Sequence, residues 1–164
     1  MTSDNQSITA TARPAIESLH RFAQQPAVQS AIGQAQARAL ARLQTEVNLP
    51  VAFVPVDLAS LPVTPPPEAR SLRVVVTREP GGDTIERHAN CAQYLYVMGT
   101  PLETHVQDGT GWRIDRYGQG AETALEDRWH YVPPGVWHKS VAPGAANWSV
   151  AAFHSAAEVE DEFQ

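Results

Sequence analysis

The sequence predicts a mainly β protein with a helical extension at its N-terminus, and two observations carry this prediction. From about residue 71 onward, short runs rich in branched and aromatic residues alternate with glycine and proline turn signals, a pattern typical of a β-sandwich or barrel. Before residue 48, apolar residues recur instead at helical spacing. A chain of 164 residues is long enough for one domain with a substantial core.

Two consecutive helices are expected near the N-terminus. The first covers residues 11–25, with Pro14 in its first turn, and the residues before it are expected to be disordered. The second begins at Pro26 and ends near Val47, and its apolar stripe consists of Val28, Ile32, Ala35, Ala39 and Leu43. The pair is interpreted as a docking or oligomerising appendage, or alternatively as a lid over a binding site.

A proline-rich connector follows the helices. Six prolines lie between Pro50 and Pro67, and because proline removes a backbone donor and restricts φ, the segment is expected to be extended and irregular. The chain is therefore divided into a helical arm with its connector (residues 1–70), a β-barrel (71–155) and an acidic C-terminal tail (156–164) that is expected to fray.

Eight strands are predicted within the β-barrel. Turn signals such as Pro80-Gly81-Gly82 and Asp108-Gly109 separate them. The predicted strands cover residues 72–78, 84–88, 93–98, 102–106, 112–117, 129–132, 139–141 and 148–154.

Composition and charge exclude several classes of partner. The net charge is −6 and no run of lysine or arginine is present, so neither nucleic acid nor an anionic membrane is an expected partner. The single cysteine, Cys91, excludes an intrachain disulfide and a cysteine-based zinc site. The N-terminus lacks the features of a signal peptide, and no apolar stretch reaches the roughly 20 residues of a membrane span. We therefore expect a cytoplasmic protein that acts on a small molecule.

The stretch from Gly81 to Gly99 contains the most informative polar residues. Glu86 and His88 are two positions apart in a predicted strand, so both side chains lie on the same face. A second histidine, His138, follows the tight turn at residues 133–135. Two histidines and one carboxylate form the facial set that suits Fe(II) with open coordination positions. The sequence therefore predicts a metal site if these three side chains converge.

The order of these residues resembles the two metal motifs of the cupin superfamily. The first cupin motif usually reads His-x-His, three or four residues, Glu, and about six residues to Gly. Its places are held here by Glu86, His88, Gln93 and Gly99. The resemblance covers about residues 71–155, and it implies a double-sheet jelly-roll barrel with the site inside.

The second cupin motif usually reads Gly, five residues, and Pro-x-Gly-x-x-His. Asp127 occupies the first place here, whereas Pro133, Gly135 and His138 match the motif. The spacing of both motifs is thus kept, but two ligand places carry different chemistry from the usual one, since a glutamate replaces the first histidine and a glutamine replaces the glutamate.

The resemblance implies a set of site residues. By position, Glu86, His88, Gln93 and His138 are the metal ligands, with Gln93 either a weak fourth ligand or a hydrogen-bond donor to the substrate. Fe(II) is the favoured metal, with Mn, Ni or Zn as alternatives. Glu86, Gln93 and Tyr96 are the candidate catalytic residues, and Tyr96 or Trp137 beside the metal would favour an aromatic substrate.

The resemblance also implies a function and an assembly. The leading hypothesis is a metal-dependent enzyme acting on a small molecule, aromatic compounds included, and foremost a non-haem Fe(II) dioxygenase. The alternatives are a redox-neutral lyase or isomerase that uses the metal as a Lewis acid, and a metal-free cupin that only binds a ligand. A homodimer is expected because cupins often pair through sheet edges or N-terminal segments. The remaining pocket candidates are three further histidines, His105, His130 and His154, whereas Cys91 is interpreted as a structural residue.

Overall fold

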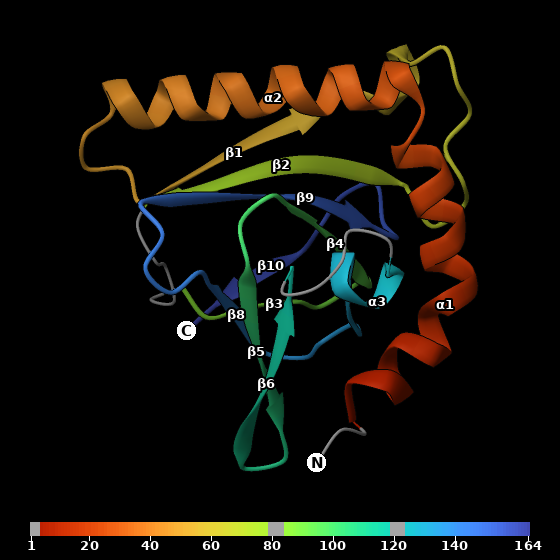
Figure 1. Cartoon of the computed structure of the whole chain (residues 1–164), viewed down its shortest axis with the longest axis vertical. Helices are drawn as coiled ribbons and strands as arrows, with labels where there is room; N and C mark the ends of the chain where they lie inside the picture. The colour runs from red at the N-terminus through yellow and green to blue at the C-terminus, as the bar shows by residue number, and fades with distance from the viewer. Residues whose placement is uncertain (1–3, 79–83, 119–123) are drawn as a thin grey trace.

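The computed structural model describes residues 4–78, 84–118 and 124–164, with side chains from residue 10 onward. Within these residues, two long helices precede two five-stranded antiparallel sheets (Figure 1). The helical elements are α1 (Asp4–Ala23), α2 (Pro26–Thr45), the short 3-10 helix η1 (Leu58–Ser60) and α3 (Leu125–Arg128). None of these helices has the length and apolarity that crossing a bilayer requires.

The two sheets face each other and enclose the barrel interior. The first sheet has the strand order β1-β2-β9-β4-β7 and the second has the order β10-β3-β8-β5-β6. The strands are β1 (Val51–Val56), β2 (Ser71–Arg78), β3 (Glu86–His88), β4 (Gln93–Met98), β5 (Leu102–Asp108), β6 (Gly111–Tyr117), β7 (Trp129–Val132), β8 (His138–Val141), β9 (Asn147–His154) and β10 (Asp161–Phe163).

The eight predicted strands are all present, and each predicted end lies within two residues of the observed one. The first and last strands, β1 and β10, are not among the predicted ones, and both lie at sheet edges. β1 forms within the expected connector and pairs with β2, and its Pro55 is tolerated because an edge strand leaves one side of its ladder unpaired. β10 forms within the tail and pairs with β3, so the expectation of a frayed tail is wrong. The turn predicted at residues 80–82 lies outside the described residues.

The first helix begins earlier than predicted. α1 already includes Asp4, and Pro14 lies inside the helix rather than in its first turn, so the expectation of disorder before residue 11 is wrong for residues 4–10. The prediction relied on apolar periodicity, which residues 4–10 lack because they are mostly polar. Packing of the later apolar residues, such as Ile16 and Leu19, stabilises the whole helix, including the first turns that the local sequence does not predict.

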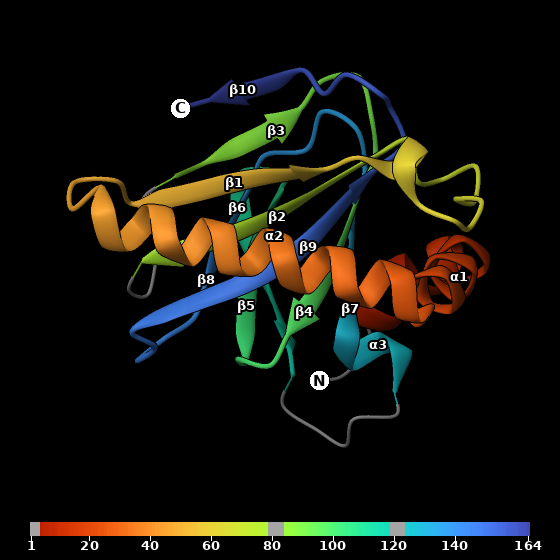
Figure 2. The same cartoon turned by 90° about the horizontal axis from the view of Figure 1, so that it is seen from above.

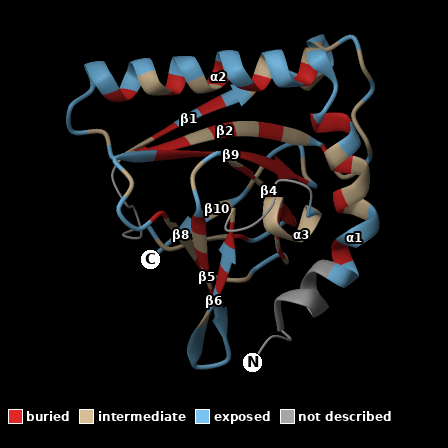
Figure 3. Cartoon of the chain, in the orientation of Figure 1, coloured by how far each residue is buried: buried red, intermediate tan, exposed pale blue. Residues whose placement is uncertain are grey.

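Both long helices cover the outer face of the first sheet, as Figure 2 shows for α2. The predicted stripe of α2 is buried at all five positions, and Figure 3 shows the buried residues on its underside. The arm therefore docks onto its own barrel, as the first of the two interpretations expected, and it does not form a lid. Because the stripe is already covered within the chain, it no longer argues for a homodimer, which stays a prediction.

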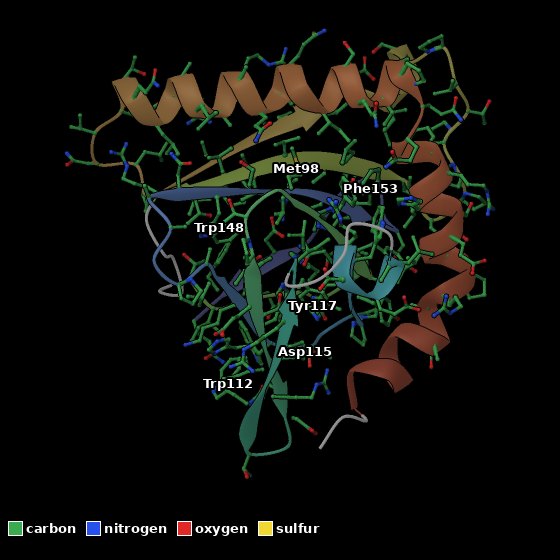
Figure 4. The ribbon with its side chains drawn as sticks, in the orientation of Figure 1. Met98, Trp112, Asp115, Tyr117, Trp148 and Phe153 are labelled. Atoms are coloured by element: carbon green, nitrogen blue, oxygen red, sulfur yellow. The ribbon has the colours of Figure 1, made fainter. Side chains whose placement is uncertain are left out.

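Successive side chains of the strands in the first sheet point alternately into two separate apolar cores. One core lies between this sheet and the helices and includes Leu19, Trp129 and Phe153. The other lies between the two sheets and includes Tyr117 and Trp148. In Figure 4, Trp148 and Tyr117 lie on the barrel side, whereas Phe153 lies near α1. The barrel interior is therefore built separately from the helical cover.

Shortening a buried side chain of α1 should destabilise the whole protein. The side chain of Leu19 is 0% exposed within the core that joins helices and sheet. We expect Leu19→Ala to lower the free energy of unfolding by about 2–5 kcal/mol, measured by urea denaturation followed by circular dichroism and tryptophan fluorescence. Val47→Ala, at a residue that is 72% exposed, is the control and should change it by less than about 0.5 kcal/mol. A helical signal that melts separately from the fluorescence signal would contradict a single cooperative unit.

Candidate metal centre

The structure brings Glu86, His88 and His138 together inside the barrel. Glu86 and His88 alternate along β3, and Glu86 lies directly opposite His138 in the register of β3 and β8. One ligand atom from each of the three lies within 4.8 Å of the others, and Glu86 Oε1 is 3.6 Å from His138 Nε2. Both histidines are buried, whereas the Glu86 side chain is 20% exposed. This group has the composition of a facial triad.

The turn before His138 is attached directly to β3. Gly135 has a φ of +73°, a left-handed conformation that glycine adopts without steric cost. Its N–H donates to the carbonyl oxygen of His88 at 2.8 Å. The glycine of the second motif thus holds the start of β8 against the strand that carries the other two residues of the group.

Hydrogen bonds to their outer nitrogens orient both histidines. His88 Nδ1 is 2.7 Å from Asp161 Oδ1, and His138 Nδ1 is 3.0 Å from the carbonyl oxygen of Val136. These oxygens only accept, so each Nδ1 carries a proton, and Nε2 is the nitrogen through which each neutral ring could bind a metal. Metal-binding histidines in proteins have the same arrangement, in which an outer oxygen fixes the tautomer and the ring orientation.

Asp161 was not among the predicted site residues. It lies opposite His88 in the register of β10 and β3, and Arg73 donates to both of its carboxylate oxygens at 2.7 and 2.9 Å. Burial by itself raises the pKa of Asp161, but the hydrogen bonds and charges of Arg73 and His88 outweigh burial and lower it. The residue is therefore an ionised acceptor for His88. No signal in the sequence pointed to it, because it belongs to the acidic tail and to neither motif.

Gln93 joins the group from the opposite sheet. It is buried, and its Nε2 donates to His88 Nε2 at 2.7 Å and lies 3.3 Å from the Nε2 of His154, its register partner on β9. Its Oε1 is buried and has no hydrogen-bond partner among the described residues. His154, a predicted pocket candidate, therefore lies beside the site, and burial, followed by Arg73 and His88, lowers its pKa to about 2.

The charge states of the group suit a divalent cation. Burial by itself raises the pKa of Glu86, but contact with His138 and the charges of His138, His88 and Arg73 lower it overall, so Glu86 is a carboxylate. Burial is also the main cause that lowers the pKa of His88, so its imidazole is neutral. A carboxylate, imidazole lone pairs and the unpartnered amide oxygen of Gln93 are donors that divalent transition metals bind, so the residues fit such an ion. Metal binding itself stays a prediction.

Tyr96 does not join the group, and its predicted catalytic role is corrected. It follows Gln93 by three positions along β4, so its ring lies on the opposite, helix-covered face, 5.0 Å from the ring of Trp129. Its hydroxyl accepts from Gln24 at 3.5 Å. The ring of Trp137, the other aromatic candidate, packs against Arg87, whose guanidinium lies 4.7 Å above it.

Two further candidates lie apart from the group. His105 alternates with the inward-facing Thr104 and contacts Glu103 at 3.3 Å on the outer face of the second sheet. Cys91 is buried, and burial raises the pKa of its thiol, in keeping with a structural role.

Comparisons with known proteins support the fold. No family model and no curated protein matches the sequence. Among solved structures, Peruvianin-I, a cysteine peptidase from Thevetia peruviana latex, matches with a TM-score of 0.54 and 12% identity over 71% of this chain and 68% of its own. Oxalate oxidase in complex with the substrate analogue glycolate matches with a TM-score of 0.52 and 18% identity over 70% of this chain and 55% of its own. A mutant of the oxalate decarboxylase from Bacillus subtilis matches with a TM-score of 0.53 and 13% identity over 71% of this chain and 28% of its own.

These matches, together with the two facing sheets, show that the chain has the cupin fold, a double-sheet jelly-roll barrel. The chain spans only about a quarter to a half of the length of the two oxalate enzymes.

Removing the carboxylate of the triad should remove the metal. We expect Glu86→Ala to lower the affinity for Fe(II), Mn(II) or Zn(II) by more than about 100-fold, since loss of a direct ligand exceeds the 10–100-fold cost of outer-shell changes. The measurement is anaerobic titration with elemental analysis of the dialysed protein. Glu103→Ala is a matched control, because Glu103 is also 20% exposed and lies beside a histidine, but on the outer face. Equal metal retention by both variants would show that the triad is wrong.

Asp161 should influence metal affinity without being a ligand. Asp161→Asn removes the charge that orients His88, so we expect affinity for Zn(II) to fall by about 10- to 100-fold. Glu162→Gln, one residue along the same strand and paired with Arg87, should leave the affinity unchanged. Competition titration with a chromophoric chelator measures both, and thermal melts establish that the variants fold. An unchanged affinity in Asp161→Asn would remove Asp161 from the site.

Proposed function

We propose that the protein is a metal-dependent enzyme acting on a small molecule, and foremost a non-haem Fe(II) dioxygenase. The observation that carries this proposal is the convergence of Glu86, His88 and His138 inside a cupin barrel. The Nδ1 atom of each histidine is hydrogen-bonded to an oxygen outside this group. Three such donors leave coordination positions open for substrate and dioxygen. A bound Fe(II) would supply the redox chemistry that dioxygen activation needs.

The residues of the chain have separate roles in this proposal. Glu86, His88 and His138 hold the metal, and Asp161 and Val136 keep the two imidazoles in the tautomer that can bind it. The amide of Gln93 borders the site, where it is placed to complete the ligand set or to hydrogen-bond a bound substrate. An apolar core that includes Tyr117 and Trp148 lies between the same two sheets.

The substrate class proposed is a small molecule with adjacent oxygen atoms that can chelate a metal. Tyr96 does not border the site, so it no longer argues for an aromatic substrate. Tyr117 and Trp148 belong to the core between the sheets. Aromatic compounds therefore stay among the proposed substrates. A cytoplasmic homodimer completes it as an expectation from the sequence.

One observation favours the metal-free alternative. The Gln93 amide occupies the lone pair of His88 Nε2, and Glu86 lies close enough to His138 to be stabilised without an ion. A protein that only binds a ligand would keep these contacts. A redox-neutral lyase or isomerase would instead use the same three ligands around a Lewis-acidic metal.

The experiment that tests the function compares turnover by protein loaded with different metals, with and without oxygen. Protein reconstituted anaerobically with Fe(II), Mn(II) or Zn(II) is first analysed for metal content and then given candidate keto and aromatic substrates, with oxygen uptake and product formation recorded. Substrate-dependent oxygen uptake by the iron form, absent in Glu86→Ala, supports the dioxygenase. Turnover by the zinc form without oxygen supports a lyase or isomerase. Failure to retain any metal after reconstitution would overturn the metalloenzyme proposal.

A further inference from the structure

A second polar group lies inside the barrel, next to the candidate metal centre. It consists of Thr104 on β5, Asp115 on β6 and His130 on β7. Thr104 and Asp115 are register partners, and His130 lies opposite Leu95, which belongs to the core between the sheets. All three residues are buried, with exposed fractions of 0%, 4% and 2%. Figure 4 labels Asp115 and Tyr117, whose side chains alternate with the exposed ones along β6.

This group contains polar atoms that the described part of the chain leaves without a partner. The Oγ1 of Thr104 and both ring nitrogens of His130 make no hydrogen bond to any described residue. His130 Nε2 lies 3.7 Å from Asp115 Oδ2, which is longer than a hydrogen bond. Buried polar groups are almost always hydrogen-bonded, so two unsatisfied side chains facing the same interior indicate that something else binds there.

Asp115 is the charged neighbour of the histidine. Arg113, two residues away on the same strand, donates to both carboxylate oxygens at 3.0 to 3.2 Å. Burial raises the pKa of Asp115, but His130 and Arg113 outweigh burial and lower it, so Asp115 is ionised. Burial is also the main cause that lowers the pKa of His130, so its ring is neutral. A carboxylate beside Nε2 favours the proton on that nitrogen, which leaves Nδ1 as an acceptor.

The strand register places this group one step from the metal ligands. Gln93 lies opposite Val132, and His130 is the next residue of β7 on the same face. Diagonal neighbours of this kind are about 7–8 Å apart along the sheet. On the second sheet His138 lies opposite Val106, and Thr104 is the next residue of β5 on that face. Both sheets therefore bring the second group within the reach of a small molecule held at the candidate metal centre.

We propose that His130 and Thr104 form a substrate-binding subsite for a hydroxyl group, with Asp115 as the positioning residue. The substrate is then a small molecule with a metal-chelating end and a hydroxyl group at its other end. The hydroxyl donates to His130 Nδ1 and accepts from Thr104 Oγ1. This inference rests on the proposed function for the chelating end, whereas the hydroxyl subsite follows from the unpartnered atoms alone.

The first test needs no ligand. Thr104→Val keeps the shape of the side chain and removes a hydroxyl that has no partner among the described residues, so we expect the melting temperature to rise by about 2–4 °C. Ser149→Ala is the matched control, because the buried hydroxyl of Ser149 accepts from Gln36 Nε2 at 3.0 Å, and we expect its melting temperature to fall. A comparable fall in Thr104→Val would show that the hydroxyl has a structural role and would overturn the subsite.

The second test uses zinc-loaded protein and two probes that differ by one hydroxyl, 4-hydroxymandelate and mandelate. We expect 4-hydroxymandelate to bind about tenfold more tightly, as one satisfied buried hydrogen bond predicts. That advantage should disappear in Thr104→Val and His130→Ala while mandelate affinity is retained. An advantage that persists in the variants, or no hydroxyl advantage in the wild type, would overturn the subsite. Zinc content is measured first, so loss of the metal site is recognised separately as failure of the proposed function.

Discussion

The candidate site depends on β3, a strand of only three residues held between β10 and β8. Short strands have few ladder hydrogen bonds, so the position of this one depends on its neighbours. Ala89 donates to the carbonyl of Glu160, and Gln164 donates to that of Ile85, both at 3.0 Å. The last residues of the chain therefore fix the strand that carries Glu86 and His88, and the site requires segments more than seventy positions apart to pair correctly.

Arg73 links this pairing to the electrostatics of the interior. It extends from β2 in the first sheet to Asp161 on β10 in the second. Its charge contributes to the lowered pKa values of Glu86, Asp161 and His154. An ionised carboxylate in a barrel interior requires such a partner, because an unpaired buried charge is costly. Glu86 and Asp161 thus remain ionised beside His88 and His138, and a carboxylate next to imidazole nitrogens is a donor set that divalent transition metals bind.

The sequence predicted what depends on local pattern. The alternation of Glu86 and His88 placed both on one face, and the strands from residue 71 to residue 154 followed from turn signals and branched residues. The same rule, applied to β4, would have separated Tyr96 from Gln93, since an odd spacing places two strand residues on opposite faces. The catalytic role expected for Tyr96 therefore failed for a reason that the sequence already contained. The hydroxyl subsite could not be predicted from the sequence in this way, because Thr104 and Asp115 belong to no motif.

The sequence by itself determined the eight strands between residues 71 and 154, the buried stripe of α2 and the cupin-like order of the site residues, because each depends on spacing within a short segment. Only the tertiary structure decided that Asp161 supports His88, that His154 and Gln93 lie together, and that β1 and β10 complete the sheets. These features arise from pairing between distant segments. Such pairing is selected by the packing of the whole barrel, and no local pattern of residues encodes it.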